Sequence, residues 1–410
     1  MDHQTSAIIT LLRSALTGER LALPDSFDWE QAVNTLCYHT LAGLGLQGAL
    51  RCGIARTHPG AGRLMALFCK DVEQSRRQTR QLQALFALFE QHGISYLPVK
   101  GAILKTLYPQ PELRPMGDAD ILIQQEQYGK IQALLPSLGF QPVEESDHEY
   151  IWKNAGLTLE LHKRLVPSYN RDYYAYYGDG WSLARPSGTS SAYSLGPEDH
   201  FIFLLVHFAK DYRDGRPSVK NICDLQVFRT AYPNMDEAYL RSELKKLRLH
   251  VFYDHILALL ACWFAGAPAA PAVELLTETT FRKSPFSQED AAMAAAVLKN
   301  AKGPTSLSGG KRKWILDRVF PPAGVLGRRY PILRRMPVLL PIFWAIRWIH
   351  AAVRRSGNIQ AGLELSKELL QADPGQVLAY ERQMNLVGLS FNREEQAGGE
   401  GRRHSSSKSI

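Results

Sequence analysis

The sequence lacks the features of secreted, disulfide-bonded and repeat proteins. Its first ten residues, MDHQTSAIIT, contain no basic region of the kind that opens a signal peptide. The five cysteines are odd in number and show no CxxC spacing, which disfavours both a disulfide framework and a thiolate zinc site. No internal repeat is found. We therefore expect a reducing compartment, and the cytoplasm is the predicted location.

The net positive charge of the chain comes from one segment. The 410 residues carry a formal net charge of +8, but residues 311–355 hold eleven Lys or Arg and one acid, Asp317. That segment contributes +10, so the other 365 residues together carry −2. Because the rest of the chain has no general basic character, no specific nucleic-acid partner is predicted. The apolar fraction of 45% and charged fraction of 21% are those of an ordinary globular protein.

The hydrophobic periodicity changes twice along the chain. Apolar residues at three- and four-residue spacing indicate helices before residue 92 and after residue 196. Between them, the order strand, helix, strand, helix and three strands predicts an α/β (α+β) fold with a small mixed sheet. The predicted regions are an N-terminal helical region (1–92), a sheet-containing core (93–195), a helical domain (196–301), a basic and apolar helical region (302–392) and a disordered tail (393–410).

Two acids open a predicted strand in the core. Asp118–Ile123, with the sequence DADILI, alternates acidic and apolar residues. Residues two apart on a strand share a face, so Asp118 and Asp120 project together. Glu160 in LTLELH is the best candidate for a third carboxylate, and His162 shares its face. Such a set repels itself unless a cation binds. It suits Mg²⁺ or Mn²⁺ and the chemistry of phosphoryl or nucleotidyl transfer.

Candidate phosphate ligands precede these acids. Gly101 opens a short predicted helix, where a phosphate can approach the backbone amides at the positive end of the helix dipole. Lys100 is a candidate contact for a triphosphate, and Arg114 is a candidate to neutralise charge in a transition state. The alternative is that both are ordinary surface charges on loops. The alternative for the two aspartates is a solvated turn.

At these motifs the chain resembles a known family. VKGAILKTLYPQPELRPMGDADILI, with the later LGF turn and LELHKRL, is similar to nucleotidyltransferases of the DNA polymerase β superfamily. The nearest branch is the one described only as uncharacterised nucleotidyltransferases. The motifs cover about residues 95–165, and weaker similarity extends to about 265. The resemblance implies that the paired acids and the third acid are metal ligands and that Lys100-Gly101 is the phosphate-side turn.

The chain also departs from the superfamily pattern. Gly101 is followed by Ala102 where the pattern has Ser or Gly, which removes one expected phosphate contact. Asp118 lies 17 residues after Gly101, a longer spacing than the superfamily pattern but normal within this branch.

The resemblance implies a reaction. A nucleoside monophosphate would pass from a nucleoside triphosphate, ATP by preference, to an acceptor hydroxyl, with release of pyrophosphate. A small molecule, a sugar, a protein side chain and RNA remain open as acceptors; members of this branch often accompany surface-polysaccharide genes, which favours a glycan. A toxin-type protein nucleotidylase differs only in its acceptor. A function of another class is a catalytically inactive scaffold that docks on a membrane or protein partner through residues 311–355.

Three further segments admit two interpretations each. His200, His207, Asp211 and Asp224 fall on two predicted helices, either as metal ligands or bases or as core residues. The aromatic stretch 169–181 either lines an acceptor pocket or packs as a loop. The stretch PVLLPIFWAIRWIHAAV (337–353) is either an interfacial helix with basic flanks, peripheral at the inner face of the membrane, or a core helix. SLSGGKRK lacks the spacing of a phosphate-binding loop and is rejected.

Overall fold

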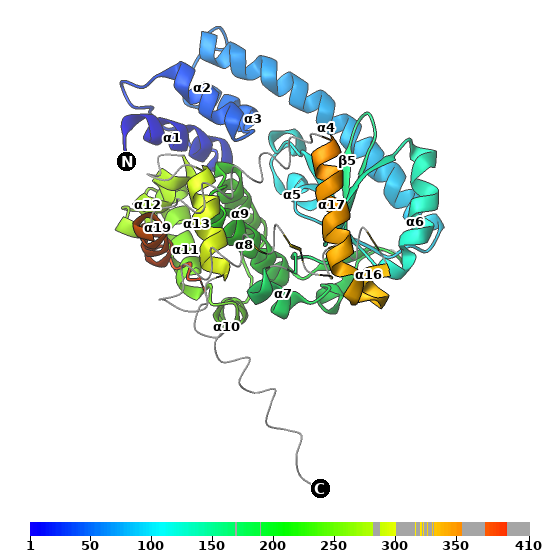
Figure 1. The fold of residues 1–410 in the computed structure, drawn as a ribbon. Helices are drawn as coiled ribbons and strands as arrows, with labels where there is room; N and C mark the ends of the chain where they lie inside the picture. Colours follow the sequence, from blue (N-terminus) through cyan, green and yellow to red (C-terminus); the bar gives the residue numbers. More distant parts are fainter. Residues whose placement is uncertain are drawn as a thin grey trace. The chain divides into compact units, whose positions relative to one another are not determined.

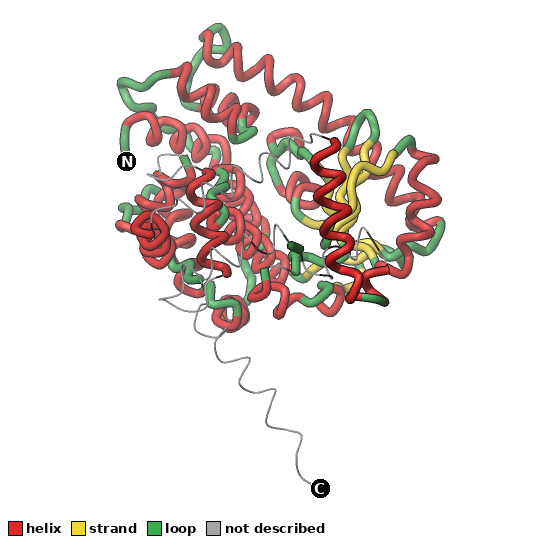
Figure 2. Tube along the Cα trace, in the orientation of Figure 1, coloured by secondary structure: helices red, strands yellow, loops and turns green. Residues whose placement is uncertain are grey.

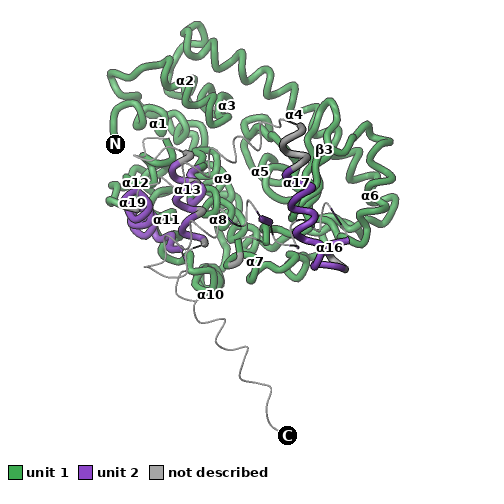
Figure 3. Tube along the Cα trace, in the orientation of Figure 1, with its two compact units in different colours: residues 1–212, 216–284 green, residues 213–215, 285–410 purple. Residues whose placement is uncertain are grey.

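A computed structural model describes residues 1–168, 170–188, 190–281, 288–300, 332–354 and 374–391, with single positions between 316 and 330. The chain divides into two compact units, shown in green and purple in Figure 3. Unit 1 comprises residues 1–212 and 216–284, and unit 2 comprises residues 213–215 and 285–410. Residues 302–313 and the predicted tail at 393–410 lie outside the described residues.

Unit 1 begins with four helices (Figure 1): α1 (His3–Thr17), α2 (Trp29–Tyr38), α3 (Ala42–Arg51) and α4 (Pro59–Gln91). Helix α4 starts at Pro59, which occupies its first turn, where no amide donor is needed. It ends at Gln91, and Gly93, with a φ of +61°, then turns the chain.

Five strands form one sheet in unit 1, drawn in yellow in Figure 2. They are β1 (Tyr96–Val99), β2 (Asp118–Ile123), β3 (Gln141–Glu145), β4 (Glu149–Lys153) and β5 (Thr158–His162). The order in the sheet is β1-β2-β5-β4-β3. β2 and β5 are parallel, and the other neighbouring pairs are antiparallel. The mixed sheet confirms the predicted α/β class.

The alternation of β2 and β5 decides which side chains face the core. Ala119, Ile121 and Leu159 are fully buried and pack with residues of α4 and with α6 (Tyr128–Leu134). The acids at the intervening positions therefore project from the other face of the sheet. Apolar burial on one face thus orders the carboxylates on the opposite face.

Short segments connect the strands. After β1 come α5 (Gly101–Leu104) and the 3₁₀ turns η1 (Lys105–Leu107) and η2 (Pro111–Leu113). After β2 come η3 (Gln125–Gln127), α6 and η4 (Leu135–Leu138). The turn η4 that follows α6 is 3₁₀ because Pro136 has no amide donor for an α-helical bond.

Helices dominate the remainder of unit 1. α7 (Arg171–Tyr177) lies in the aromatic stretch, and its Tyr173 and Tyr177 are buried, so these two rings pack inside the unit. The 3₁₀ turn η5 (Trp181–Leu183) and a two-stranded ribbon follow, and then five helices complete the unit. These elements are β6 (Ala184–Pro186), β7 (Tyr193–Leu195), α8 (Pro197–Arg213), α9 (Val219–Ala231), α10 (Glu237–Lys246), α11 (His250–Ala265) and α12 (Pro271–Thr280).

Unit 2 is helical where it is described. It contains α13 (Gln288–Asn300), α16 (Ile332–Arg335), η6 (Pro337–Leu339), α17 (Leu340–Arg354) and α19 (Pro374–Leu386), and α13 packs on α19. The apolar stretch 337–353 forms η6 and most of α17. Among the described residues, none of the helices has both the length and the apolar character needed to cross a bilayer.

Candidate active site

Three carboxylates meet on two neighbouring strands. In the β2–β5 register, Asp118 pairs with Thr158, and Asp120 pairs directly with Glu160. Asp118, Asp120 and Glu160 all line one cavity of about 480 Å³ in unit 1. The acids proposed from sequence as a set are therefore brought together, across 42 residues of chain, by a parallel strand pair.

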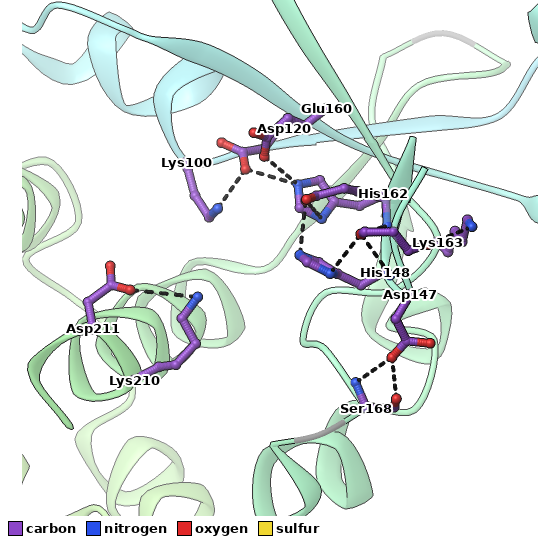
Figure 4. A network of polar contacts seen from close by, with 12 residues as sticks. Lys100, Asp120, Asp147, His148, Glu160, His162, Lys163, Ser168, Lys210 and Asp211 are labelled. Atoms are coloured by element: carbon purple, nitrogen blue, oxygen red, sulfur yellow. Dashed lines mark hydrogen bonds and ion pairs between the residues drawn. The ribbon is translucent and has the colours of Figure 1, made fainter. Parts of the chain in front are cut away.

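Lys100 reaches Asp120 from the end of the neighbouring strand. Val99 pairs with Asp120 in the sheet, and the Lys100 Nζ lies 2.6 Å from Asp120 Oδ1 (Figure 4). Lys100 has φ +46° and ψ −119°, a strained conformation for a residue with a side chain. Burial lowers the pKa of Lys100, but Asp120, Asp118 and Glu160 outweigh it and raise the pKa overall. The lysine is therefore held as a cation.

His162 contacts the same carboxylate from β5. Its Nε2 lies 3.0 Å from Asp120 Oδ1 and 3.6 Å from Glu160 Oε2, and its side chain is 5% exposed. Burial lowers the pKa of His162, but the hydrogen bonds to Asp120 and Glu160 outweigh burial, so that the net shift is upward. Burial would raise the pKa of Asp120, but Lys100 and His162 hold it well below its usual range. Asp120 is therefore ionised.

Asp118 lacks such close support. Burial, together with repulsion from Asp120 and Glu160, raises its pKa from 3.8 to about 6, although Lys100 and Lys220 act in the opposite direction. The cluster thus carries more negative charge than its nearby cations neutralise at this position. A group of oxygen ligands under mutual repulsion fits a hard divalent cation.

Gly101 follows the strained lysine and closes the turn tightly. A Cβ at this position would lie 2.8 Å from Met116 Cγ and 3.0 Å from the Arg114 Nη1. The glycine therefore lets the first amides of α5, the cavity and Arg114 approach one another.

Replacement of Gly101 by alanine is expected to destabilise the protein by about 1–3 kcal/mol, because Met116 must move to admit the methyl group. Gly129 in α6 is the matched control, since nothing lies within 4 Å of its added Cβ. Gly129→Ala should be neutral or stabilising by up to about 1 kcal/mol. Thermal melting of both variants tests this. Equal effects would contradict the close approach at Gly101.

Arg114 is anchored in the wall of the cavity. Its Nε and Nη2 each donate to Asp224 at 2.8 Å, and Tyr108 donates to the same carboxylate at 2.8 Å. Arg114 and Asp224 are 6% and 5% exposed. Burial lowers the pKa of Arg114, but Asp224 outweighs it and raises the pKa. Asp224 therefore fixes the guanidinium so that its Nη1 lies beside Gly101.

The cavity is also lined by cations that the sequence reasoning missed. Lys210 of α8, Arg216 and Lys220 line it, and Ser218 caps α9 by accepting from the Lys220 amide. Burial and then Arg114 lower the pKa of Lys220. Lys220 makes no ion pair with a carboxylate in the part of the chain that the structure describes. A lysine in the first turn of a helix is disfavoured by the helix dipole unless an anion lies nearby. The position of Lys220 at the start of a predicted helix was therefore the feature of the sequence that could have indicated this site.

Of the four residues considered on α8 and α9, His207, Asp211 and Asp224 line the cavity and His200 does not, and the four have separate partners. His207 Nδ1 lies 3.1 Å from Asp211 Oδ2, Asp224 pairs with Arg114, and the buried His200 packs against Phe228. Burial lowers the pKa of His200 to about 4. Among the described residues, the groups close enough to share a metal ion are a different set: Asp120, Glu160 and His162, and His148, Glu149 and His162.

Comparisons with known proteins agree with the motifs. A family model described as uncharacterised nucleotidyltransferase matches residues 25–265. No curated protein matches the chain. A solved structure of the antibiotic-resistance factor ANT(2'')-Ia is similar at 13% identity over 45% of this chain and 96% of that chain, with a TM-score of 0.31, a likeness too weak to carry an argument. Because the family model spans more than half of the 410 residues, the chain belongs to the uncharacterised nucleotidyltransferase family.

Proposed function

We propose that the protein is a metal-dependent nucleotidyltransferase. It moves a nucleoside monophosphate from a nucleoside triphosphate, ATP by preference, to an acceptor hydroxyl and releases pyrophosphate. The observation that supports this most is the lining of one cavity, which combines three carboxylates from the sheet with Lys210 of α8 and Lys220 of α9. The acceptor class is an alcohol on a sugar, a small molecule or a protein.

Asp118, Asp120 and Glu160 are the residues that would hold Mg²⁺ or Mn²⁺. They offer oxygen ligands, which both ions prefer, and the pKa of Asp118 is raised by burial and then by repulsion from Asp120 and Glu160. When bound, the metal supplies positive charge to the oxygens of the transferred phosphoryl group. Lys100 and His162 keep Asp120 ionised and oriented.

The triphosphate has cationic and amide ligands on both sides of the cavity. Lys100, Gly101 and the Nη1 edge of Arg114 lie on the sheet side. Lys220 and the start of α9, which Ser218 caps, line the same cavity from the helical part of unit 1. The backbone amides and the dipole of α9 favour an anion there. These groups would bind the phosphates and stabilise the negative charge of departing pyrophosphate.

The transfer step conserves atoms and charge. A new bond forms between the acceptor oxygen and the α-phosphorus, and the bond from that phosphorus to the oxygen bridging to the β-phosphate breaks. The acceptor proton passes to one of the clustered carboxylates. The electron pair of the broken bond leaves with pyrophosphate.

Lys220→Met should weaken nucleoside triphosphate binding by about tenfold or more, since a hydrogen bond to a charged group is worth about 1.5–3 kcal/mol. Lys245→Met is the matched control, because this exposed lysine lies in the last turn of α10, outside the cavity. Calorimetric titration with ATP and magnesium measures both. Equal affinities in the two variants would remove Lys220 from the triphosphate site.

Calorimetry of the wild-type protein also separates the enzyme from the scaffold. The enzyme should bind a nucleoside triphosphate with magnesium and lose that binding when the metal is chelated. Glu160→Gln should weaken the magnesium-dependent binding while the protein stays folded. Nucleotide binding that is absent, or that is indifferent to magnesium, would favour the scaffold.

A further inference from the structure

A second cluster of metal-ligand side chains lies beside the carboxylates. Glu149 of β4 pairs with His162 of β5 in the antiparallel register, so their side chains share a face of the sheet. His148 directly precedes β4, and its ring lies 5.6 Å from the ring of His162 (Figure 4). One ligand atom from each of the three residues lies within 4.8 Å of the others.

His162 carries an unsatisfied nitrogen that points into this cluster. The side chain is 5% exposed, and its buried Nδ1 has no hydrogen-bond partner among the described residues. The nearest carboxylate oxygen across the cluster is Glu149 Oε2, at 3.9 Å. A buried polar atom without a partner is costly, and in a native protein it calls for an explanation such as an ion.

In each histidine, the ring nitrogen that faces away from the proposed cluster already has an oxygen partner. His162 Nε2 lies 3.0 Å from Asp120 Oδ1, and His148 Nδ1 lies 3.3 Å from Ser146 Oγ. Metal-binding histidines in proteins usually donate their other ring N–H to a carboxylate, carbonyl or water, which fixes the tautomer and the ring. With the proton on Nε2, His162 presents Nδ1 as its ligand atom. His148 presents Nε2, which lies 2.9 Å from Glu149 Oε2.

We propose that His148, Glu149 and His162 form a second metal site, which binds a divalent transition-metal ion. Two imidazoles and one carboxylate are a donor set typical of zinc and of related first-row ions, unlike the all-oxygen set of Asp118, Asp120 and Glu160. Both histidines and Glu149 also line the 480 Å³ cavity, so an ion held here has its remaining positions on the cavity side. This site does not depend on the proposed nucleotidyl transfer.

Cobalt is the probe for this site. Full-length protein, stripped of metal with a chelator and kept free of nucleotide, is titrated with Co²⁺. The wild type should develop visible absorption from low-coordinate cobalt that saturates at one ion per chain, whatever further Co²⁺ the carboxylates bind, and Zn²⁺ should displace the absorbing ion. His148→Ala and Glu149→Gln should each lower the cobalt affinity by at least about tenfold.

Asp118→Asn is the matched control, because it removes a ligand of the oxygen site and leaves the histidine site intact. The Asp118→Asn variant should retain the visible absorption of bound Co²⁺. Circular dichroism establishes that each variant is folded, and Glu149→Gln, which keeps the size of the side chain, serves if His148→Ala does not fold. Absence of the bands in the wild type, or bands unchanged in both variants, would overturn the second site. Nucleotide turnover is measured separately with magnesium, so failure of one proposal does not imply failure of the other.

Discussion

Asp118→Asn is expected to lower nucleotidyl transfer by about a thousandfold, or about 4 kcal/mol of transition-state stabilisation, and yet to stabilise the metal-free protein. The substitution removes a proposed metal ligand, which accounts for the expected loss of activity. It also removes a charge that burial and the neighbouring Asp120 and Glu160 disfavour, as the pKa near 6 shows. Stability and activity should therefore change in opposite directions at this residue.

The stability change has a definite pH dependence. The pKa of Asp118 is raised in the folded protein from an ordinary 3.8 to about 6, so ionisation costs stability as the pH rises from 4 to 6. In chelator, Asp118→Asn should be more stable than the wild type by about 1–3 kcal/mol at pH 7, and the difference should close near pH 4. Urea unfolding at both pH values measures it. Asp25→Asn, at an exposed position, is the control and should change neither stability nor activity. If the variant is less stable than the wild type at pH 7, the ionised Asp118 is not destabilised by burial and by its acidic neighbours.

Arg114→Met should lower the free energy of unfolding by about 3–5 kcal/mol, the largest stability loss expected from one substitution in the site. The guanidinium and the Asp224 carboxylate are both nearly inaccessible to water and joined by two hydrogen bonds of 2.8 Å. Removal of the arginine leaves a buried carboxylate without its cation. Urea unfolding of the chelated protein provides the measurement.

A double variant separates the ion pair from simple loss of packing. Arg114→Met combined with Asp224→Asn removes both charges and keeps an acceptor for Tyr108, so it should be more stable than Arg114→Met alone. The pair Arg241–Asp254 is the surface control, with side chains 48% and 52% exposed, and its loss should change the stability far less than Arg114→Met does. If the double variant is no more stable than Arg114→Met, the buried charge is not the cause.

The strand that carries the acids was predictable from local pattern. Alternation in Asp118–Ile123 places Ile121 and Ile123 in the core and fixes both ends of β2 as the structure has them. The same alternation placed Glu160 and His162 on one face of β5. The family resemblance rests on motifs that contain the same residues. The family match over residues 25–265 confirms this resemblance.

Long-range partners were not predictable from that pattern. Arg114 is 110 residues from Asp224, and no periodicity in the sequence joins them. Asp224 was considered with the histidines of the preceding helix, because helical spacing shows which residues share a helix face but not which helix they meet. The His148 cluster was missed for a related reason: it depends on the antiparallel β4–β5 register, which places Glu149 opposite His162.

The measurement that tests the proposed chemistry most directly is transfer from labelled nucleoside triphosphates. Purified protein is incubated with each of the four, with magnesium or manganese and with cell extract as a source of acceptor. The Asp118→Ala/Asp120→Ala variant is treated in the same way. Pyrophosphate release with label transfer by the wild type alone is the predicted result. Release that is equal in both proteins, or absent from both with every nucleotide and either metal, would contradict a nucleotidyltransferase centred on Asp118, Asp120 and Glu160.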